Sequence, residues 1–403
     1  MTTKLVLAAA AAGMFTAAGA QAADLPVAPE PVNYVRVCDA YGSGFFYIPG
    51  TETCLRIGGG MRVEFRFNDF ADDGNSNWGT RDGNATTTRA RAYARFDSRT
   101  ATEYGLLRTY VDLWFTGDSG GSTNAKVTLK NGFIQFGGFT FGRLGHGFFD
   151  FYTGDAWGSM LDQGFSDHET TAFAYTYGFG NGVSASLSIE DATFSRGKLA
   201  NGFDADGNVV DAFGGHKLPD LVANVRIDQG WGAAQVMGAL HQVNGKGSKT
   251  GAPVVDSEVG FAIGAGVTFN LPMIAPKDSV SFQAAYAQGA AQYVSSNLDL
   301  DGVVKGGNTV DTTTAWGIGG GFKHYWTSQL TSGFSASYAS LEAFGNTYDV
   351  DQWAVQGNLA WQPVSGFLMG VELEYLNETY DHPSANLKDD DDLVGMFRVQ
   401  RMF

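Results

Sequence analysis

The sequence is poor in several features that soluble enzymes have in abundance. Its 403 residues include only 2 Cys and 10 Pro, and 17% are charged, against about 25% in a typical soluble domain. Beyond the first 22 residues, no apolar run is long enough to form a membrane-spanning helix. The composition therefore argues against an ordinary soluble enzyme and against a helical membrane protein.

Glycine and aromatic residues are plentiful instead. There are 55 Gly, aromatic residues make up 13% of the chain, and the net charge is −16. The acidic balance argues against nucleic-acid binding, which needs cationic groups for the phosphates. The aromatic content is too high for a disordered, solvated chain.

The N-terminus has the pattern of a secretory signal peptide. Lys4 supplies the positive charge, Leu5 to Ala20 is apolar, and Ala20-Gln21-Ala22 is a small-x-small cleavage site. A membrane anchor is the alternative, but the run is short and no stop-transfer pattern follows. We expect residues 1–22 to be removed and the chain to be exported.

Several later segments alternate apolar and polar residues, as the strands of a transmembrane β-barrel do. In Val183 to Glu190 every second residue is apolar, and in Phe367 to Tyr375 Glu372 and Glu374 alternate with apolar residues. A soluble β-sandwich also alternates. Trp and Tyr near strand ends, and short turns alternating with long polar connections, favour the barrel.

Counting these segments predicts an all-β, 16-stranded antiparallel barrel over residues 55–403. An even count returns both termini to the periplasm, where residues 23–54 would form an N-terminal segment. The predicted strands start near Leu55, Thr88, Gly105, Val127, Gly138, Thr171, Val183, Leu218, Gly232, Ser257, Ser279, Thr312, Gln329, Tyr348, Gly366 and Leu393. Near Val127 and Gly138 both faces are apolar or Gly-rich, which a subunit interface would explain.

The alternation turns a set of basic side chains toward the barrel interior. Charges facing lipid cost about 2–4 kcal/mol at mid-membrane, so these arginines should line water. Glu64 is on the same inward face. The predicted basic ladder of the pore consists of Arg62, Arg66, Arg89, Arg91, Arg95 and Arg108.

Two stretches resemble the N-terminal signature of the alphaproteobacterial porin family: residues 33–42 (NYVRVCDAYG) and 44–59 (GFFYIPGTETCLRIGG). Residues 136–142 (FGGFTFG) and 148–152 (FFDFY) resemble that family's fifth strand and the start of its third loop. The resemblance covers the whole mature chain. It implies a homotrimer of 16-stranded barrels, passive diffusion of small hydrophilic solutes, and a third external loop that narrows the pore.

We expect that loop to be Leu144 to Glu169 and to lie opposite the basic ladder. Such a pair would create a transverse field that favours small polar or charged solutes. The alternative is a solvated loop with purely structural arginines. The predicted acidic residues of the loop are Asp150, Asp155, Asp162, Asp167 and Glu169.

The two cysteines, Cys38 and Cys54, belong to an exported chain, so a disulfide is expected. The resemblance implies the same bridge. A metal pair would need two more ligands, and the six histidines show no ligand spacing. We therefore expect neither metal nor cofactor.

The chain ends on Phe403 after an alternating strand, which resembles the signal read by the outer-membrane assembly machinery. We expect that machinery, outer-membrane lipid and lipopolysaccharide to be partners. Alternatives are a sugar- or anion-selective channel, an adhesin, and an outer-membrane enzyme using His324, which falls on the lipid-facing side. The ladder favours anions and the acidic loops favour cations, so the sequence leaves ion preference open.

Overall fold

The structure is a computed structural model that describes residues 36–70, 77–119, 125–161, 164–204, 208–246, 255–343, 349–381 and 389–403. The predicted signal peptide and the first residues of the N-terminal segment lie outside these ranges. Within them, none of the helices has the length and apolar character needed to span a membrane.

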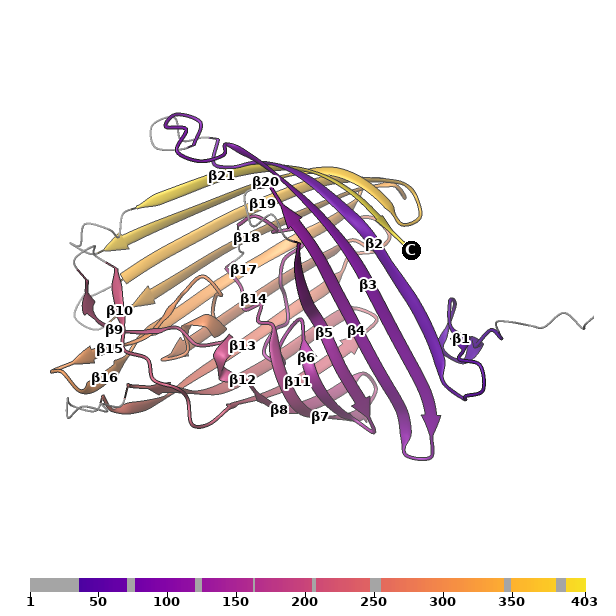
Figure 1. Ribbon diagram of the computed structural model, residues 1–403, viewed down its shortest axis with the longest axis horizontal. Coiled ribbons are helices and arrows are strands. Elements are labelled where there is room, and N and C mark those ends of the chain that lie inside the picture. The colour runs from indigo at the N-terminus through magenta and orange to yellow at the C-terminus, as the bar shows by residue number, and fades with distance from the viewer. Residues whose placement is uncertain are drawn as a thin grey trace, which may run out of the picture.

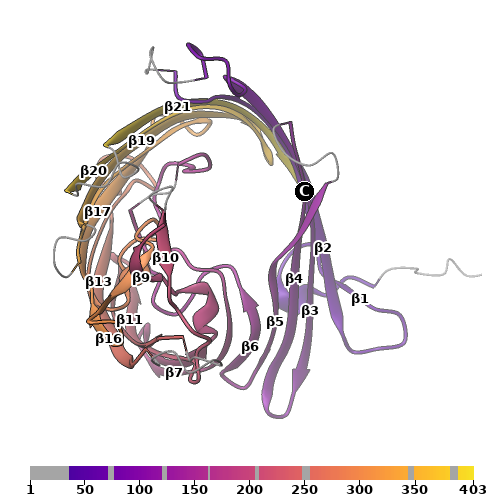
Figure 2. The same ribbon diagram turned by 60° about the vertical axis from the view of Figure 1, so that its left-hand side comes forward.

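Sixteen antiparallel strands form a closed barrel (Figures 1 and 2), which confirms the predicted fold. Every strand begins within three residues of its predicted start. The barrel strands are β2 (Cys54–Phe67), β3 (Thr86–Thr102), β4 (Gly105–Asp118), β5 (Lys126–Phe136), β6 (Phe139–Leu144), β7 (Thr170–Gly180), β8 (Val183–Glu190), β11 (Asp220–Gln229), β12 (Gly232–Asn244), β13 (Ser257–Asn270), β14 (Ser279–Gln288), β17 (Thr314–Tyr325), β18 (Leu330–Glu342), β19 (Asp349–Val364), β20 (Phe367–Asp381) and β21 (Asp390–Met402).

The barrel closes where its first strand meets its last. β2 pairs with β3 on one side and with β21 on the other. The backbones of Gly59 and Phe403 exchange two hydrogen bonds of 3.0 and 3.1 Å. Closure leaves no sheet edge unpaired. A sheet in lipid must close in this way, because no water is present to bond to the backbone groups of an open edge.

The alternation of each strand separates a lipid-facing surface from the interior. On β20, Val371 and Leu373 are exposed on the outside, whereas Glu372 and Glu374 are buried inside. Inward glycines are found where another segment approaches closely. A Cβ atom at Gly266 or Gly319 would collide with the ring of Phe151 or Phe165. Part of the high glycine content therefore makes room for a segment inside the barrel.

A small N-terminal unit lies at the end of the barrel where β2 begins (Figure 1). It contains the 3₁₀ helix η1 (Asp39–Tyr41) and strand β1 (Phe46–Tyr47), which pairs with the start of β2. Cys38 and Cys54 form the predicted disulfide, and both are buried with Phe45.

The long connections at the other end contain a second sheet that the sequence did not predict. It has the order β10 (Val209–Asp211), β9 (Lys198–Phe203), β15 (Leu300–Lys305) and β16 (Thr309–Thr312). We call it the external sheet; Figure 1 shows it beyond the ends of the barrel strands. Two 3₁₀ helices, η2 (Ala192–Phe194) and η3 (Ala291–Tyr293), belong to the same connections.

Candidate functional site

The inward arginines of β2, β3 and β4 form aligned rows, because the three strands are paired in continuous register. Arg62 is opposite Arg91, which is opposite Thr116; Arg95 is opposite Asp112. We call this surface, together with Arg398 of β21, the basic wall. Eight of its nine arginines form ion pairs with four carboxylates, those of Glu64, Asp97, Asp112 and Asp118. The ninth, Arg91, bonds to a hydroxyl group.

Most of these arginines are neutralised in part by a neighbouring carboxylate. Glu64 is fully buried and forms ion pairs with three of them: Arg62 at 2.9 Å, Arg398 at 2.8 Å, and Arg66. Asp97 is bound by another three, and Arg89 and Arg95 pair with Asp118 and Asp112 at 2.6 and 3.1 Å. The partners of Asp97 are Arg56, Arg99 and Arg108.

Arg91 differs from the rest of the predicted ladder. Its Nε donates to the Thr116 hydroxyl at 2.8 Å, and its guanidinium lies 4.3 Å from the centre of the Trp114 ring. Lys130 lies 5.3 Å from the same ring centre. Among the described residues, no carboxylate pairs with Arg91, so its positive charge is not locally neutralised.

The segment between β6 and β7, residues 145–169, runs inside the barrel along the wall formed by β11 to β20 (Figure 2). We call it the inner loop. Asn224 of β11 donates to Phe148 O at 2.6 Å, and Tyr152 N donates to Gln283 of β14 at 2.9 Å. Ser335 of β18 accepts from Asp155 N at 2.7 Å. The loop therefore lines the side of the barrel across from β2–β4.

Two buried carboxylates of β20 hold the far end of the inner loop. Glu372 accepts hydrogen bonds from Trp157 N and from Gly158 N at 3.1 Å. Glu374 accepts from the next three backbone N–H groups, with Leu161 N at 2.7 Å. Trp157 also lies under the Arg398 guanidinium, 4.2 Å from it. The loop tip is thus fixed to β20 and to the basic wall.

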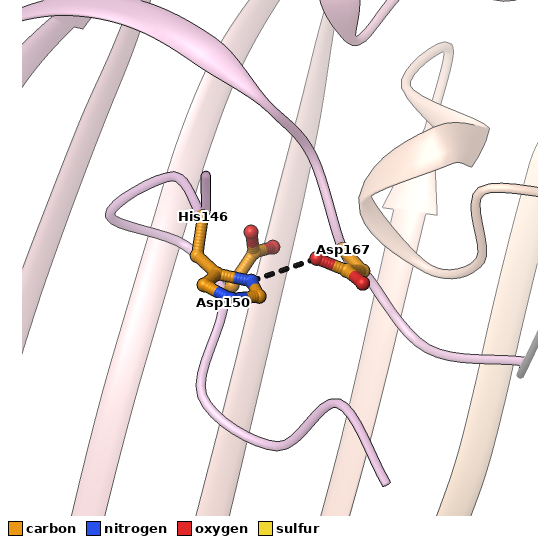
Figure 3. Close-up of side chains that lie close together, drawn as sticks. All are labelled: His146, Asp150 and Asp167. Atoms are coloured by element: carbon orange, nitrogen blue, oxygen red, sulfur yellow. Dashed lines mark hydrogen bonds and ion pairs between the residues drawn. The ribbon is translucent and has the colours of Figure 1, made fainter. Parts of the chain in front are cut away.

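The predicted acidic residues of this loop have different surroundings. Asp150 accepts from Gly147 N at 2.8 Å, His168 N at 3.0 Å and the Ser166 hydroxyl, and burial raises the pKa of its carboxyl. Next to Asp150, the carboxylate of Asp167 pairs with His146 at a distance of 2.7 Å (Figure 3). Asp150 and Asp167 thus close the base of the loop.

Glu169 of the loop is paired with basic side chains, whereas the charge of Asp155 is less compensated. Glu169 binds both Lys130 and Arg143 at 2.8 Å. Asp155 accepts from the neutral Tyr152 hydroxyl at 2.9 Å, and burial raises the pKa of its carboxyl. Asp162 lies outside the described residues.

The sequence prediction did not assign a function to the residues that anchor this loop. Glu372 and Glu374 were visible only as carboxylates on the inward face of one strand, and Arg398 as a cation near the C-terminus. His324, considered for an enzyme site, has its Nδ1 2.6 Å from Asp278 and its ring 4.4 Å from that of Trp326. Among the described residues, none of its hydrogen-bond partners is a serine.

A closed 16-stranded barrel with a charged lumen and a loop folded inside it defines the class of outer-membrane porins. Similarity to solved structures agrees with this fold. The outer-membrane channel DcaP of Acinetobacter baumannii has a TM-score of 0.67 at 14% identity, covering 89% of this chain and 99% of that one. OmpF of Salmonella typhi has a TM-score of 0.53 at 10% identity, covering 87% and 98%.

Residues 24–397 match the Porin subfamily, and the chain belongs to this family. It is 30% identical over 419 residues to Porin Omp2b of Brucella abortus strain 2308, and 31% identical over 417 residues to Porin Omp2b of Brucella suis biovar 1 strain 1330. Both alignments cover 100% of each chain. The chain is an outer-membrane channel for passive diffusion of small hydrophilic solutes.

Proposed function

We propose that the pore is narrowed between the basic wall and the inner loop, and that it passes small anions somewhat faster than small cations. The surplus of arginines over carboxylates on the basic wall supports this preference most directly. The inner loop offsets only part of the surplus, because Asp167 and Glu169 are already paired with basic side chains. A passing anion therefore meets uncompensated positive charge, above all at Arg91.

Planar-bilayer measurements test this proposal. We expect stepwise conductance, and a reversal potential in a salt gradient that indicates weak anion preference. A fixed charge acting on an ion at about 4 Å in water contributes about 1 kcal/mol, which is about fivefold in permeability. Replacing Arg62, Arg66 and Arg91 by Ala should therefore lower the anion-to-cation permeability ratio by at least about fivefold. Arg196→Ala, in the external connections, is the control. An unchanged reversal potential in the triple variant would show that these arginines do not line the constriction.

The proposal includes a homotrimer of pores. A Vibrio cholerae outer-membrane protein of similar fold, OmpT, is described in a trimer form, with a TM-score of 0.50. On this chain, the exposed Phe139 and Phe141 of β6 stack with ring centres 5.7 Å apart, beside Ile134 of β5. Such a face suits contact with another subunit. Native mass spectrometry of the detergent-extracted protein tests this, and a monomer at all detergent concentrations would contradict it.

Export completes the proposal. We infer cleavage after Ala22, recognition of Phe403 by the barrel assembly machinery, and contact of the outer surface with lipid and lipopolysaccharide. N-terminal sequencing of the protein from outer membranes should start at Ala23. Deletion of Phe403 should reduce the amount of folded barrel in the membrane, measured by heat-modifiable migration on gels.

A further inference from the structure

A buried histidine lies between two buried aspartates where the barrel meets the external connections. His241 is near the end of β12; its Nδ1 is 2.8 Å from Asp220 at the start of β11, and its Nε2 is 3.5 Å from Asp301 of β15. All three side chains are 0% exposed. Two buried carboxylates repel each other strongly unless a cation lies between them.

Other hydrogen bonds connect Asp220 and Asp301 to η3 and to the residues between η2 and β9. Asp220 accepts from the Tyr293 hydroxyl of η3 at 2.8 Å and from the Ser195 hydroxyl at 2.6 Å. Asp301 accepts from Gly197 N, just before β9, and from Ala291 N at 2.9 Å. The trio therefore fastens the external sheet and both 3₁₀ helices to the barrel wall.

The same contacts reach the root of the inner loop. The Tyr293 ring is 5.0 Å from that of Phe149 and 5.7 Å from that of His168. Glu190 is opposite Asp220 in the β8–β11 pairing and accepts from Phe148 N at 3.0 Å. A displacement of Asp220 or Tyr293 would therefore move the surface on which the inner loop rests.

The groups that face the trio are acidic or neutral, so the positive charge between the two aspartates comes from His241. They are Glu190 of β8 and Tyr293 of η3, with Asp150 and His168 of the inner loop behind them. In the described part of the chain, no Lys or Arg pairs with Asp220 or Asp301. Loss of the imidazolium charge would leave the carboxylates of Asp220, Asp301 and Glu190 close together without a compensating cation.

We propose that protonated His241 is a positioning residue that locks the external sheet to the inner loop, so that the width of the pore depends on its charge. This inference rests on the proposed role of the inner loop as the constriction. At neutral pH the lock is closed. When His241 loses its proton in alkaline solution, repulsion between Asp220 and Asp301 releases the external sheet and loosens the inner loop.

Hydrogen exchange of the full-length protein in detergent tests the lock apart from conductance. Asp301 itself belongs to β15, outside the barrel strands, so the barrel of Asp301→Asn should still fold. We expect the amides of 198–203 and 300–305 to exchange on the order of 100-fold faster, as breaking a buried ion pair implies. Asp299→Asn is the matched control, because Asp299 pairs with Lys198 at the surface. Equal exchange in the two variants would overturn the lock.

The pH profile separates an effect of charge from a loss of packing. The intrinsic rate of amide exchange itself depends on pH. The exchange of residues 300–305 is therefore divided by that of residues 350–364 in barrel strand β19. In the unmodified protein, protection of 300–305 should fall in alkaline solution, whereas in His241→Gln it should be low at every pH. His216→Gln, at a half-exposed pair with Asp191, should keep the unmodified profile. A flat profile in the unmodified protein would refute the role of the charge.

Single-channel recordings then test the link to the pore. Asp301→Asn should show larger conductance fluctuations than Asp299→Asn at neutral pH. If exchange increases in Asp301→Asn but the fluctuations do not, the lock exists but does not position the inner loop, and the proposal fails at that step. Loss of anion preference in the triple arginine variant tests the constriction itself, independently of His241.

Discussion

Replacing Glu372 by Gln should release the end of the inner loop. The Glu372 carboxylate is 1% exposed and accepts from Trp157 N, from Gly158 N and from the Asn358 side chain at 3.0 Å. A glutamine offers one oxygen and turns an NH₂ group toward these donors. Hydrogen bonds to a charged acceptor contribute about 1.5–3 kcal/mol each, and water in the lumen can replace part of this.

A net loss of about 2–3 kcal/mol is therefore expected, which raises the undocked fraction of the loop roughly 30- to 150-fold. Hydrogen exchange of the Trp157 and Gly158 amides measures this change directly, and single-channel noise measures its effect on the pore. Glu378→Gln is the matched control, because Glu378 is on the same strand but binds Gln352 and Tyr380 and not the inner loop. The same increase in both variants would refute a specific anchor.

Three further predictions concern the inner loop and the N-terminal unit. Because burial raises the pKa of Asp155, its carboxylate should take up a proton at a higher pH than an ordinary aspartate does. Anion preference, measured by the reversal potential, should increase as the pH falls through that range, and Asp155→Asn should abolish this increase. Trp157→Leu removes the stacking on Arg398, about 0.5–1 kcal/mol, and should raise exchange of the Ser159 amide two- to fivefold; no change would refute the contact. Reduction of Cys38–Cys54, which are 16 residues apart, should destabilise residues 36–53 by about 3 kcal/mol and speed their proteolysis, while the barrel melts as before; a lower barrel melting temperature would contradict this.

The barrel strands could be predicted because lipid imposes a strict alternation on each of them. Val371 and Leu373 face lipid, so Glu372 and Glu374 between them must face inward, whatever the neighbouring strands do. Strands β5 and β6 were also predicted, although the sequence there is apolar or Gly-rich on both faces. Strand starts were accurate because a turn or a polar loop interrupts the alternation before each strand.

The site could be predicted only in part, because parity gives the direction of a side chain but not its partner. It turned Arg62, Arg66 and Glu64 inward, but it did not show that one buried carboxylate binds both arginines and Arg398, which is 334 residues from Glu64. It also did not separate Asp155 from the paired acids of the loop. Such differences depend on contacts between distant segments.

The external sheet was missed for a related reason. Its strands have three to six residues, and the pairing of β9 with β15 is parallel and joins two connections about 100 residues apart. No local pattern marks such a pairing. His241 likewise occurs in an alternating strand like any other residue, and only the fold brings Asp220 and Asp301 to its two sides.

The seam between β2 and β21 makes completion of the barrel depend on a strand that follows every other barrel strand in the sequence. Phe403 bonds to Gly59, and Arg398 joins Glu64 in the basic wall, so one edge of β2 stays unpaired until β21 is in place. A chain truncated by even one strand keeps two open edges that lipid cannot satisfy. The architecture therefore couples stability to closure: a chain that lacks β21 cannot complete the sheet and cannot become a stable channel.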